Sequence, residues 1–312
     1  MRVGFIGLGQ MGAGMASNIQ KKGFDFVVND VNAQSASRFL STGATWAATP
    51  KELAEQSDVI FTSLPGPSQV EVVALGENGL IEGMKPGAAY FDLSTSTPTL
   101  IRKIATEFEK RGFFALDAPV SGGPAGASSG KLAVWAGGDK EVFEKNKHVL
   151  DAFSDAAVYV GPVGAGSIAK LVHNCMGFII STGLAEVFTL GVKAGADPLA
   201  LWAAVRQGAI GRWGVFERIK DTLLINKYDP ALFALSLAHK DVLLATNLGR
   251  EFNVPMRLSN LALEEMTEAL NRGWGNRDAW STMQLQTERA GVKIAVDPAQ
   301  IEALLAPERA KK

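Results

Sequence analysis

The spacing of apolar residues changes once along this chain, near residue 160, and that change limits its possible folds more than any other feature. Before it, short apolar runs alternate with helical stretches, which is typical of a parallel sheet covered on both faces. After Gly161-Pro162-Val163-Gly164, apolar residues repeat every three or four positions, the period of a helix. We therefore predict an α/β domain followed by an all-α domain.

The predicted strands are short runs rich in Val, Ile and Phe. They cover residues 2–6, 25–29, 59–64, 89–93, 113–118, 132–136 and 157–160, and the charged segment 139–147 is expected to be a surface helix. We place the first domain at residues 1–163, a long linking helix at 164–193 and the all-α domain at 194–312. The active site is expected in the cleft between the domains.

The linking helix is apolar on nearly all sides, so we expect it to be buried between domains or between subunits. A membrane span is the competing interpretation, and His173, Asn174 and Glu186 within the helix argue against it. Asp197-Pro198 and Asp229-Pro230 both have the composition of a helix start. Gly273 is expected to end a helix that begins near Arg257, and the charged tail 308–312 is expected to fray.

Charge and composition favour a small-molecule partner. The 31 basic and 32 acidic residues nearly cancel, which disfavours nucleic acid and anionic membranes as partners. One cysteine, Cys175, and three histidines without metal-ligand spacing lead us to expect no metal. The chain starts with an apolar strand and shows no leader, so we expect a cytoplasmic protein. Its apolar helices lead us to expect a homodimer or homotetramer.

The first predicted strand runs directly into Gly7-Leu8-Gly9-Gln10-Met11-Gly12 and then into a helix. Gly7 permits a tight turn, Gly9 lets the backbone approach a pyrophosphate, and Gly12 lets helix and strand pack closely. The free N–H groups at the helix start suit an anion. This arrangement predicts a Rossmann-type dinucleotide site, in which all six residues contact the cofactor.

Asp30 ends the second predicted strand, where a carboxylate accepts hydrogen bonds from the adenosine ribose. A carboxylate at this place repels a 2′-phosphate, and the residues that follow, Val31, Asn32 and Ala33, include no arginine. We therefore expect NAD as the cofactor and NADP as the less favoured one.

Two further segments point to a chemical site. Ser121, Gly122 and Gly123 can present a hydroxyl and exposed N–H groups to an anion such as a substrate carboxylate. Lys170 stands on an apolar helix, where partial desolvation would lower a lysine pKa into the range useful for proton transfer. A second lysine, Lys240, is predicted on an apolar face with Phe233, Leu237 and Leu244.

At this point the sequence resembles the β-hydroxyacid dehydrogenase family, which includes 3-hydroxyisobutyrate dehydrogenase, tartronate semialdehyde reductase and glyoxylate/succinic semialdehyde reductases. The resemblance covers almost the whole chain. The segments that carry it are Gly7-Leu-Gly-Gln-Met-Gly12, Asp92-Leu-Ser-Thr95, Asp117-Ala-Pro-Val-Ser-Gly-Gly123, Gly164-Ala-Gly-Ser-Ile-Ala-Lys170 and Lys240-Asp241.

The resemblance implies a role for each matching residue. Lys170 corresponds to the catalytic lysine, and the substrate contacts would be Ser121, Gly122, Gly123 and Asn174. The positions that match contacts to the nicotinamide half of the cofactor are Leu64, Pro65, Gln69, Thr95 and Lys240.

One departure concerns the segment after Lys170. The family usually shows Lys-x-x-Asn-Asn, whereas this chain has His173 before Asn174, as 6-phosphogluconate dehydrogenase does. In that relative the histidine contacts a polyhydroxylated substrate, so the resemblance points to His173 as a substrate contact. A helix histidine bonded to backbone or buried by packing is the open alternative.

We therefore expect an NAD(P)-dependent enzyme that interconverts a small 3-hydroxy acid and its semialdehyde, with Lys170 as general acid/base. The alternatives are a tartronate, succinic or glyoxylate-type semialdehyde reductase, an oxidative decarboxylase similar to 6-phosphogluconate dehydrogenase, an imine reductase and a non-catalytic NAD-binding module. Arg212, Trp213 and Phe233 are candidates for selecting the substrate.

Overall fold

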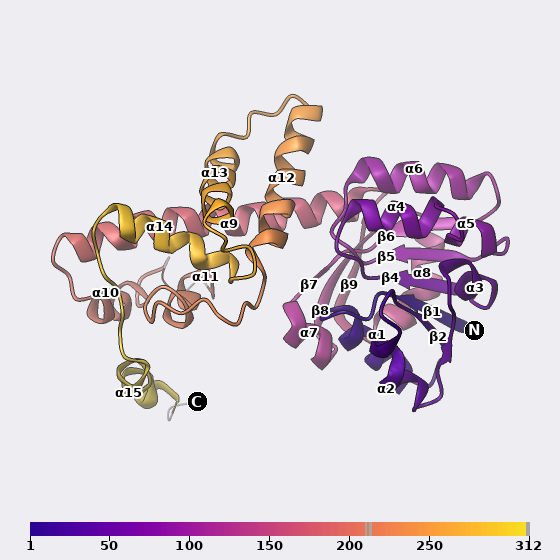
Figure 1. Cartoon of the computed structure of the whole chain (residues 1–312), viewed down its shortest axis with the longest axis horizontal. Helices are drawn as coiled ribbons and strands as arrows, with labels where there is room; N and C mark the ends of the chain where they lie inside the picture. The colour runs from indigo at the N-terminus through magenta and orange to yellow at the C-terminus, as the bar shows by residue number, and fades with distance from the viewer. Residues whose placement is uncertain (210, 212–213, 310–312) are drawn as a thin grey trace. The chain divides into compact units, whose positions relative to one another are not determined.

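The structure, a computed structural model, describes residues 1–209, 211 and 214–309. Its internal contacts divide the chain into two compact units, Met1–Val172 and His173–Lys312. The division falls inside one long helix, α9 (Ala165–Lys193), which runs from one unit into the other. The first unit is α/β and the second is helical, as the change of period predicts (Figure 1).

One sheet organises the first unit. Its strands are β1 (Arg2–Ile6), β2 (Asp25–Asn29), β3 (Thr45–Trp46), β4 (Val59–Thr62), β5 (Ala89–Asp92), β6 (Phe114–Asp117), β7 (Val120–Ser121), β8 (Leu132–Gly137) and β9 (Ser154–Gly161). The order is β3-β2-β1-β4-β5-β6-β8-β7, with β9 paired to β8. All expected strands are present. The pattern does not predict β3 and β7, which have two residues each, too few for a period to show.

The sheet is parallel from β3 to β6, which confirms the expected arrangement there. At the far side it is mixed, because β8 runs antiparallel to both β6 and β7 while β9 runs parallel to β8. The predicted parallel arrangement therefore holds from β3 to β6, and the edge formed by β7 and β8 departs from it.

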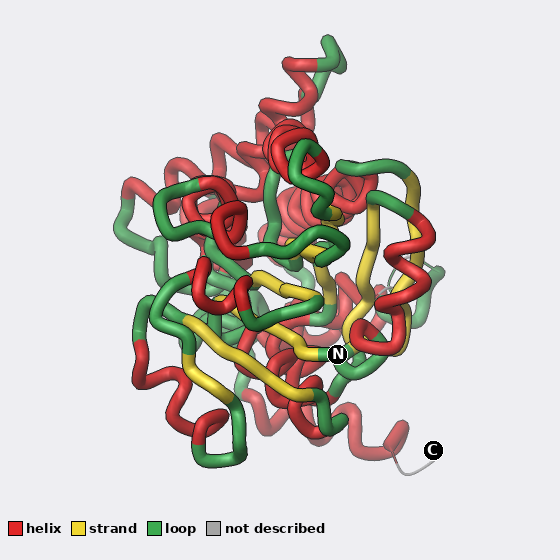
Figure 2. The backbone as a smooth tube through the Cα atoms, turned by 90° about the vertical axis from the view of Figure 1, so that its right-hand side faces the viewer, coloured by secondary structure: helices red, strands yellow, loops and turns green. Residues whose placement is uncertain are grey.

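Helices cover both faces of the sheet, as Figures 1 and 2 show. They are α1 (Gly12–Lys21), η1 (Ala33–Ala36), α2 (Ser37–Leu40), α3 (Pro50–Glu55), α4 (Pro67–Leu75), α5 (Leu80–Gly83), α6 (Pro98–Glu109), α7 (Gly123–Ser129) and α8 (Lys140–Leu150). Side chains of α1, α7 and α8 share one buried core with Val3 and Phe5 of β1. Those of α3 to α6 share the other core with Ile6. This alternation along β1 is the period of two expected of a strand.

A buried carboxylate joins the sheet to the start of α9. Asp117, the last residue of β6, is 1% exposed, and its Oδ1 accepts the Gly164 N–H at 2.7 Å while Oδ2 accepts the Ser167 N–H at 2.6 Å. A Cβ at Gly166 would lie 2.1 Å from the Trp135 carbonyl oxygen. Only glycine fits so close to β8, and the first turn of α9 is therefore held against the ends of two strands.

The second unit is built from helices, as expected. Besides α9 it contains α10 (Pro198–Val205), α11 (Gly214–Glu217), η2 (Arg218–Asp221), α12 (Leu235–Glu251), α13 (Arg257–Asn271), η3 (Ala279–Ser281), α14 (Thr282–Arg289) and α15 (Pro298–Arg309). Asp197 caps α10 by accepting the Ala200 N–H at 2.8 Å, which confirms that start signal. Gly273, with φ +79°, follows the end of α13 and confirms the predicted stop.

The predicted helix start at Asp229-Pro230 is wrong. The peptide bond between these residues is cis, and the next helix, α12, begins at Leu235. The intervening chain is held by another residue, because the Asp278 carboxylate accepts the N–H groups of Leu232 and Phe233. These bonds keep the segment out of a helix, and Phe233 therefore precedes α12 instead of sharing a helical face with Lys240.

Helix α9 is buried on only one side of this chain. It is long and apolar enough to cross a membrane by length and composition, and 33% of its most apolar window is buried. Leu171, Cys175 and Phe178 are buried, whereas Met176, Val187 and Leu190 are between 54% and 67% exposed. The expectation of complete burial is therefore not met within one chain.

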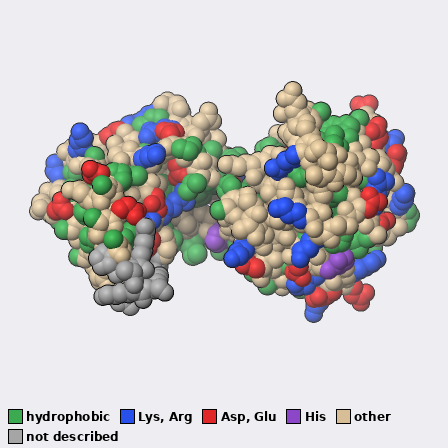
Figure 3. Space-filling model, turned by 90° about the horizontal axis from the view of Figure 1, so that it is seen from below, with side chains coloured by type: hydrophobic (Ala, Val, Ile, Leu, Met, Phe, Trp, Pro, Cys, Tyr) green, Lys and Arg blue, Asp and Glu red, His purple; other side chains and the backbone are tan. Residues whose placement is uncertain are grey.

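Charges of both signs are mixed over the face shown in Figure 3. This agrees with the near-equal numbers of basic and acidic residues in the sequence. No single-sign field of the kind that attracts nucleic acid dominates that face.

A second buried carboxylate lies next to Asp117 in the sheet. Asp92 ends β5, pairs in register with Asp117 and is 1% exposed. Its Oδ1 accepts the Thr62 hydroxyl and the Ser94 N–H, each at 3.0 Å. Burial raises the pKa of Asp92 from 3.8 to about 6, with a smaller contribution from the charge of Asp117, although the hydrogen bonds from Ser94 and Thr62 lower it.

Asp92 should therefore make folding stability fall as pH rises. Between about pH 4 and pH 6 the folded chain keeps a proton that the unfolded chain has released, and above this window the loss is complete. A pKa shift from 3.8 to about 6 corresponds to a total loss of about 3 kcal/mol in the free energy of unfolding. Asp92→Asn keeps the acceptor oxygen without the charge, so its stability relative to wild type should rise by about 2 kcal/mol between about pH 4 and pH 7.

Urea unfolding of both proteins at the two pH values measures this change, and the exposed Asp155→Asn is the control for losing a surface carboxylate. If the difference in free energy of unfolding between Asp92→Asn and wild type is the same at both pH values, ionisation of Asp92 does not destabilise the fold.

Candidate active site

The glycine-rich turn between β1 and α1 has the geometry that its sequence predicts. Gly7 has φ +92°, and a Cβ there would lie 2.3 Å from the Ser63 carbonyl oxygen. A Cβ at Gly12 would lie 1.8 Å from the Gly7 carbonyl oxygen. Both positions therefore exclude any side chain, Gly7 through backbone conformation and contact, Gly12 through contact alone.

Gly9 differs from its two neighbours, because a Cβ there would meet nothing within 4 Å. Glycine at this place is not required by the protein's own packing, which leaves room for a ligand to approach the backbone. Helix α1 starts without a side-chain cap and without an acidic residue in its first turn. An anion is therefore favoured at this helix start, and the turn fits the pyrophosphate of a dinucleotide.

Asp30 lies directly beside this turn. Its Oδ2 accepts the Leu8 N–H at 2.6 Å, and its Oδ1 accepts the Asn32 N–H at 2.7 Å. The carboxylate is thus fixed by two backbone groups, and its oxygens retain capacity for further donors. A ribose whose hydroxyls donate to Asp30 would fit the predicted dinucleotide site.

The residues expected near the nicotinamide fall into two groups. Leu64 and Pro65 lie in the loop between β4 and α4, Gln69 lies in the first turn of α4, and Thr95 lies in the loop after β5. The first loop is tied to the second by the Leu64 N–H, which donates to the Ser94 Oγ at 2.9 Å. Lys240 belongs to α12 in the second unit. The structure therefore brings the first four together in one unit and places the lysine in the other.

The predicted anion loop is more ordered than its sequence suggests. Ser121 belongs to β7 and pairs with Ala133 of β8, and Gly123 is the first residue of α7. Gly122 and Gly123 have φ +133° and +63°, a conformation that side chains disfavour. Both glycines are exposed, so their backbone is open to a ligand.

Lys170 is half-buried on α9, three residues beyond Ser167. Since Asp117 holds Ser167, the helical turn before Lys170 is fixed to the sheet. Asn174 follows four residues later and shares the same helical face. His173 is exposed, which excludes the interpretation that packing buries it.

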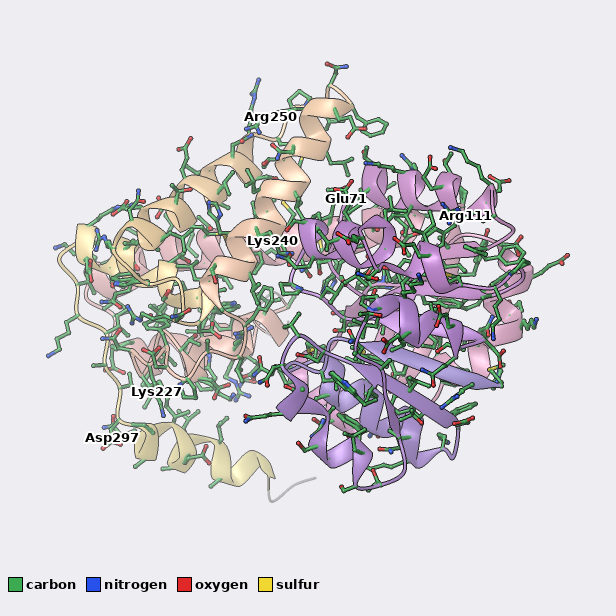
Figure 4. All side chains as sticks on the ribbon, turned by 45° about the vertical axis from the view of Figure 1, so that its right-hand side comes forward. Glu71, Arg111, Lys227, Lys240, Arg250 and Asp297 are labelled. Carbon is green, nitrogen blue, oxygen red and sulfur yellow. The ribbon has the colours of Figure 1, made fainter. Side chains whose placement is uncertain are left out.

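Asn174 and Lys240 meet at a residue that the sequence pattern did not single out. Asn174 Nδ2 donates to Asp241 Oδ2 at 2.6 Å, and Lys240 Nζ lies 2.7 Å from Asp241 Oδ1. Figure 4 labels Lys240 on α12. The signal for Asp241 was its place directly after Lys240 in a segment that carries the family resemblance.

Of the residues expected to select the substrate, Arg212 and Trp213 lie outside the described residues. Phe233 is half-buried and stacks on Phe178 of α9, with ring centroids 6.3 Å apart and an interplanar angle of 16°. Within the described part of the chain, no group of three or more His, Cys, Asp or Glu residues is arranged to hold a metal ion.

Two family models match the chain. Residues 2–161 match the NAD binding domain of 6-phosphogluconate dehydrogenase, and residues 164–285 match the NAD-binding domain of NADP-dependent 3-hydroxyisobutyrate dehydrogenase. Together they cover the sheet unit and most of the helical one.

Named relatives agree with these matches. 2-(Hydroxymethyl)glutarate dehydrogenase of Eubacterium barkeri is 32% identical over 95% of this chain and 98% of its own. NAD-dependent L-serine dehydrogenase of Pseudomonas aeruginosa is 32% identical over 89% of this chain and 95% of its own. The crystal structure of 3-hydroxyisobutyrate dehydrogenase from Salmonella typhimurium, 30% identical, superposes with a TM-score of 0.80 over 91% of this chain and 99% of its own. The chain belongs to the β-hydroxyacid dehydrogenase family and is an NAD(P)-dependent hydroxyacid dehydrogenase of the 3-hydroxyisobutyrate dehydrogenase type.

Proposed function

We propose that this enzyme oxidises acids of the form HOCH2–CH(R)–COO⁻ to the corresponding semialdehydes, with R a small group. The support is chemical: 2-(hydroxymethyl)glutarate, L-serine and 3-hydroxyisobutyrate, the compounds in its relatives' names, all contain this unit and differ only in R. Such a substrate needs an anion site for its carboxylate and a proton acceptor for its hydroxyl. The Ser121 segment and Lys170 are our candidates for these two roles.

The observation that carries the proposal is the fixed start of α9. Asp117 binds the N–H groups of Gly164 and Ser167, so the turn before Lys170 has one position relative to the sheet. A bound nicotinamide supplies the hydride acceptor. The uncharged amine of Lys170 takes the hydroxyl proton as the carbon is oxidised, and in the reverse direction its ammonium returns that proton. The carboxylate is held by the Ser121 hydroxyl and the N–H groups of Gly122 and Gly123.

We propose NAD as the preferred cofactor because Asp30 is held beside the glycine-rich turn by two backbone N–H groups. A fixed carboxylate repels a 2′-phosphate and accepts a hydrogen bond from a 2′-hydroxyl. We expect kcat/KM for NAD to exceed that for NADP by at least about tenfold, or about 1.4 kcal/mol. Asp30→Ser should lower the ratio of kcat/KM for NAD to kcat/KM for NADP.

Initial rates with both cofactors test this preference. Asp25→Ser, at the exposed opposite end of the same strand, should leave the ratio unchanged. Equal use of NAD and NADP by the wild-type enzyme would contradict the assignment of Asp30.

Replacing Lys170 tests the proposed mechanism. General acid/base groups contribute about 10² to 10⁴ in rate, so Lys170→Ala should lower kcat by that range while NAD binding is retained. Lys170→Arg keeps the charge but cannot release a proton at a usable pH, so it should be nearly as inactive. The wild-type kcat/KM for oxidation should rise with pH through an ionisation that Lys170→Ala lacks.

Steady-state rates over a pH series, with melting temperatures as a check on folding, make this comparison. Lys193→Ala, which removes an exposed lysine from the last turn of the same helix, should leave kcat unchanged. A Lys170→Ala enzyme within tenfold of wild type and with the same pH profile would remove Lys170 from the chemistry.

We also propose that a second copy of the chain covers the exposed apolar side of α9, giving at least a dimer. Met176, Val187 and Leu190 follow one face of the helix at intervals of whole turns, and exposed apolar surface of this extent favours association. Light scattering at micromolar concentration should give a mass of at least twice 33.1 kDa. A mass of one chain would contradict the proposal.

A further inference from the structure

Asp241 is a charged residue in the interior of the helical unit. It lies on α12 and is 1% exposed. A carboxylate removed from water loses its hydration and must find partners inside the protein. Its two oxygens have different partners, one from α9 and one from α12 itself.

The partner from α9 is Asn174. Its Nδ2 donates to Asp241 Oδ2 at 2.6 Å. An ionised carboxylate can only accept hydrogen bonds, so it fixes which end of the amide faces it. The nitrogen of Asn174 is turned toward Asp241, and the carbonyl oxygen is turned away.

The partner from α12 is Lys240, whose Nζ lies 2.7 Å from Asp241 Oδ1. Adjacent residues on a helix do not face each other, so this contact requires the lysine side chain to fold back toward its neighbour. Lys220 and Asp221 form a pair of the same kind at 2.5 Å, but the Asp221 side chain is 61% exposed, against 2% for Asp241. Burial and the third partner, Asn174, distinguish the pair at Asp241.

We propose that Asp241 is a positioning residue of the dehydrogenase site. Its buried carboxylate holds the Asn174 amide with the carbonyl oxygen presented as an acceptor, and it holds the Lys240 ammonium in one place. An acceptor at Asn174 selects substrates that offer an O–H or N–H donor, as the hydroxyl of HOCH2–CH(R)–COO⁻ does. This inference rests on the proposed function, which assigns Asn174 to the substrate and Lys240 to the nicotinamide half of the cofactor.

Asp241→Asn tests the proposal with little change of shape. The new amide both donates and accepts, so Asn174 is no longer held in one orientation and Lys240 loses its counter-charge. We expect kcat/KM for the hydroxy acid to fall by about tenfold or more. Asp221→Asn is the matched control, because it breaks the exposed Lys–Asp pair and should leave kcat/KM unchanged.

A double-mutant cycle separates positioning from general structural support. Asp241→Asn is compared with wild type and again within the Asn174→Ala/Lys240→Met background. If Asp241 acts through these two residues, its replacement in that background should change kcat/KM by less than about threefold. The same loss in both backgrounds would show that Asp241 supports the fold independently, and it would overturn the proposal.

A variant that removes one partner of the Lys240–Asp241 ion pair can fail to fold. Lys240→Met/Asp241→Asn avoids this problem because it lacks both charges, whereas Lys240→Met keeps the buried Asp241 carboxylate without its cation, so its melting temperature is measured as a check on folding. Comparing Lys240→Met with Lys240→Met/Asp241→Asn isolates the effect of Asp241 on Asn174. We expect kcat/KM to be lower in the double variant. No loss would exclude the orientation of Asn174 as the role of Asp241.

Failure of this inference differs from failure of the proposed function. If no HOCH2–CH(R)–COO⁻ acid is oxidised by wild type, the proposed function is wrong. If wild type is active, Lys170→Ala is inactive and Asp241→Asn is within threefold of wild type, the function stands and the positioning role does not.

Discussion

The contact on which the proposed site depends most is the one between the Asp117 carboxylate and the backbone of Gly164 and Ser167. It joins the last residue of β6 to the first turn of α9, and α9 carries Lys170 and Asn174. The two hydrogen bonds are short and lie in the interior, where a carboxylate without partners would be costly. Gly166 completes the contact, because a side chain there would collide with the carbonyl oxygen of Trp135. Asp117 at the end of β6 and Gly164 and Gly166 at the start of α9 therefore form one connected contact, although they are far apart in the sequence.

Buried aspartates recur beside the candidate site residues, at the ends of β5 and β6 and within α12. Asp92 accepts hydrogen bonds from Thr62 and Ser94, and Ser94 in turn binds the Leu64 loop. Asp241 binds Asn174 and Lys240. Burial raises the pKa values of Asp92 and Asp117, so part of the folding free energy is spent on keeping these carboxylates inside. Each of these buried aspartates fixes the position of a loop or side chain that packing alone would not fix.

Sequence patterns predicted the fold well where a local cause decides the structure. The first strand, the second strand and the cap at Asp197 follow from periodicity and capping chemistry, and the structure confirms them. Asp229-Pro230 has the same local signal as Asp197-Pro198, but Asp278, distant in sequence, holds the chain after it. The helix start was therefore overruled by a long-range contact that no local pattern reveals.

The same distinction applies to the site. Gly7, Gly9, Gly12 and Asp30 were predictable because one short segment contains the whole phosphate-binding geometry. Asp241 was not, since its importance comes from Asn174, 67 residues earlier in the chain. Its neighbour Lys240 drew attention through its predicted place on an apolar helix face and through the family resemblance. A positioning residue such as Asp241 is identified from its side-chain contacts, which only the structure provides.

Isotope transfer tests the central claim, that this enzyme removes hydride from the hydroxymethyl carbon of a HOCH2–CH(R)–COO⁻ acid. The three acids in the relatives' names would be supplied with two deuterium atoms on that carbon, together with NAD, and the reduced cofactor would be analysed by mass spectrometry. The account predicts one deuterium in each molecule of reduced cofactor formed and none when unlabelled acid reacts in D2O. Reduced cofactor without deuterium, or no cofactor reduction with any of these acids, would contradict it.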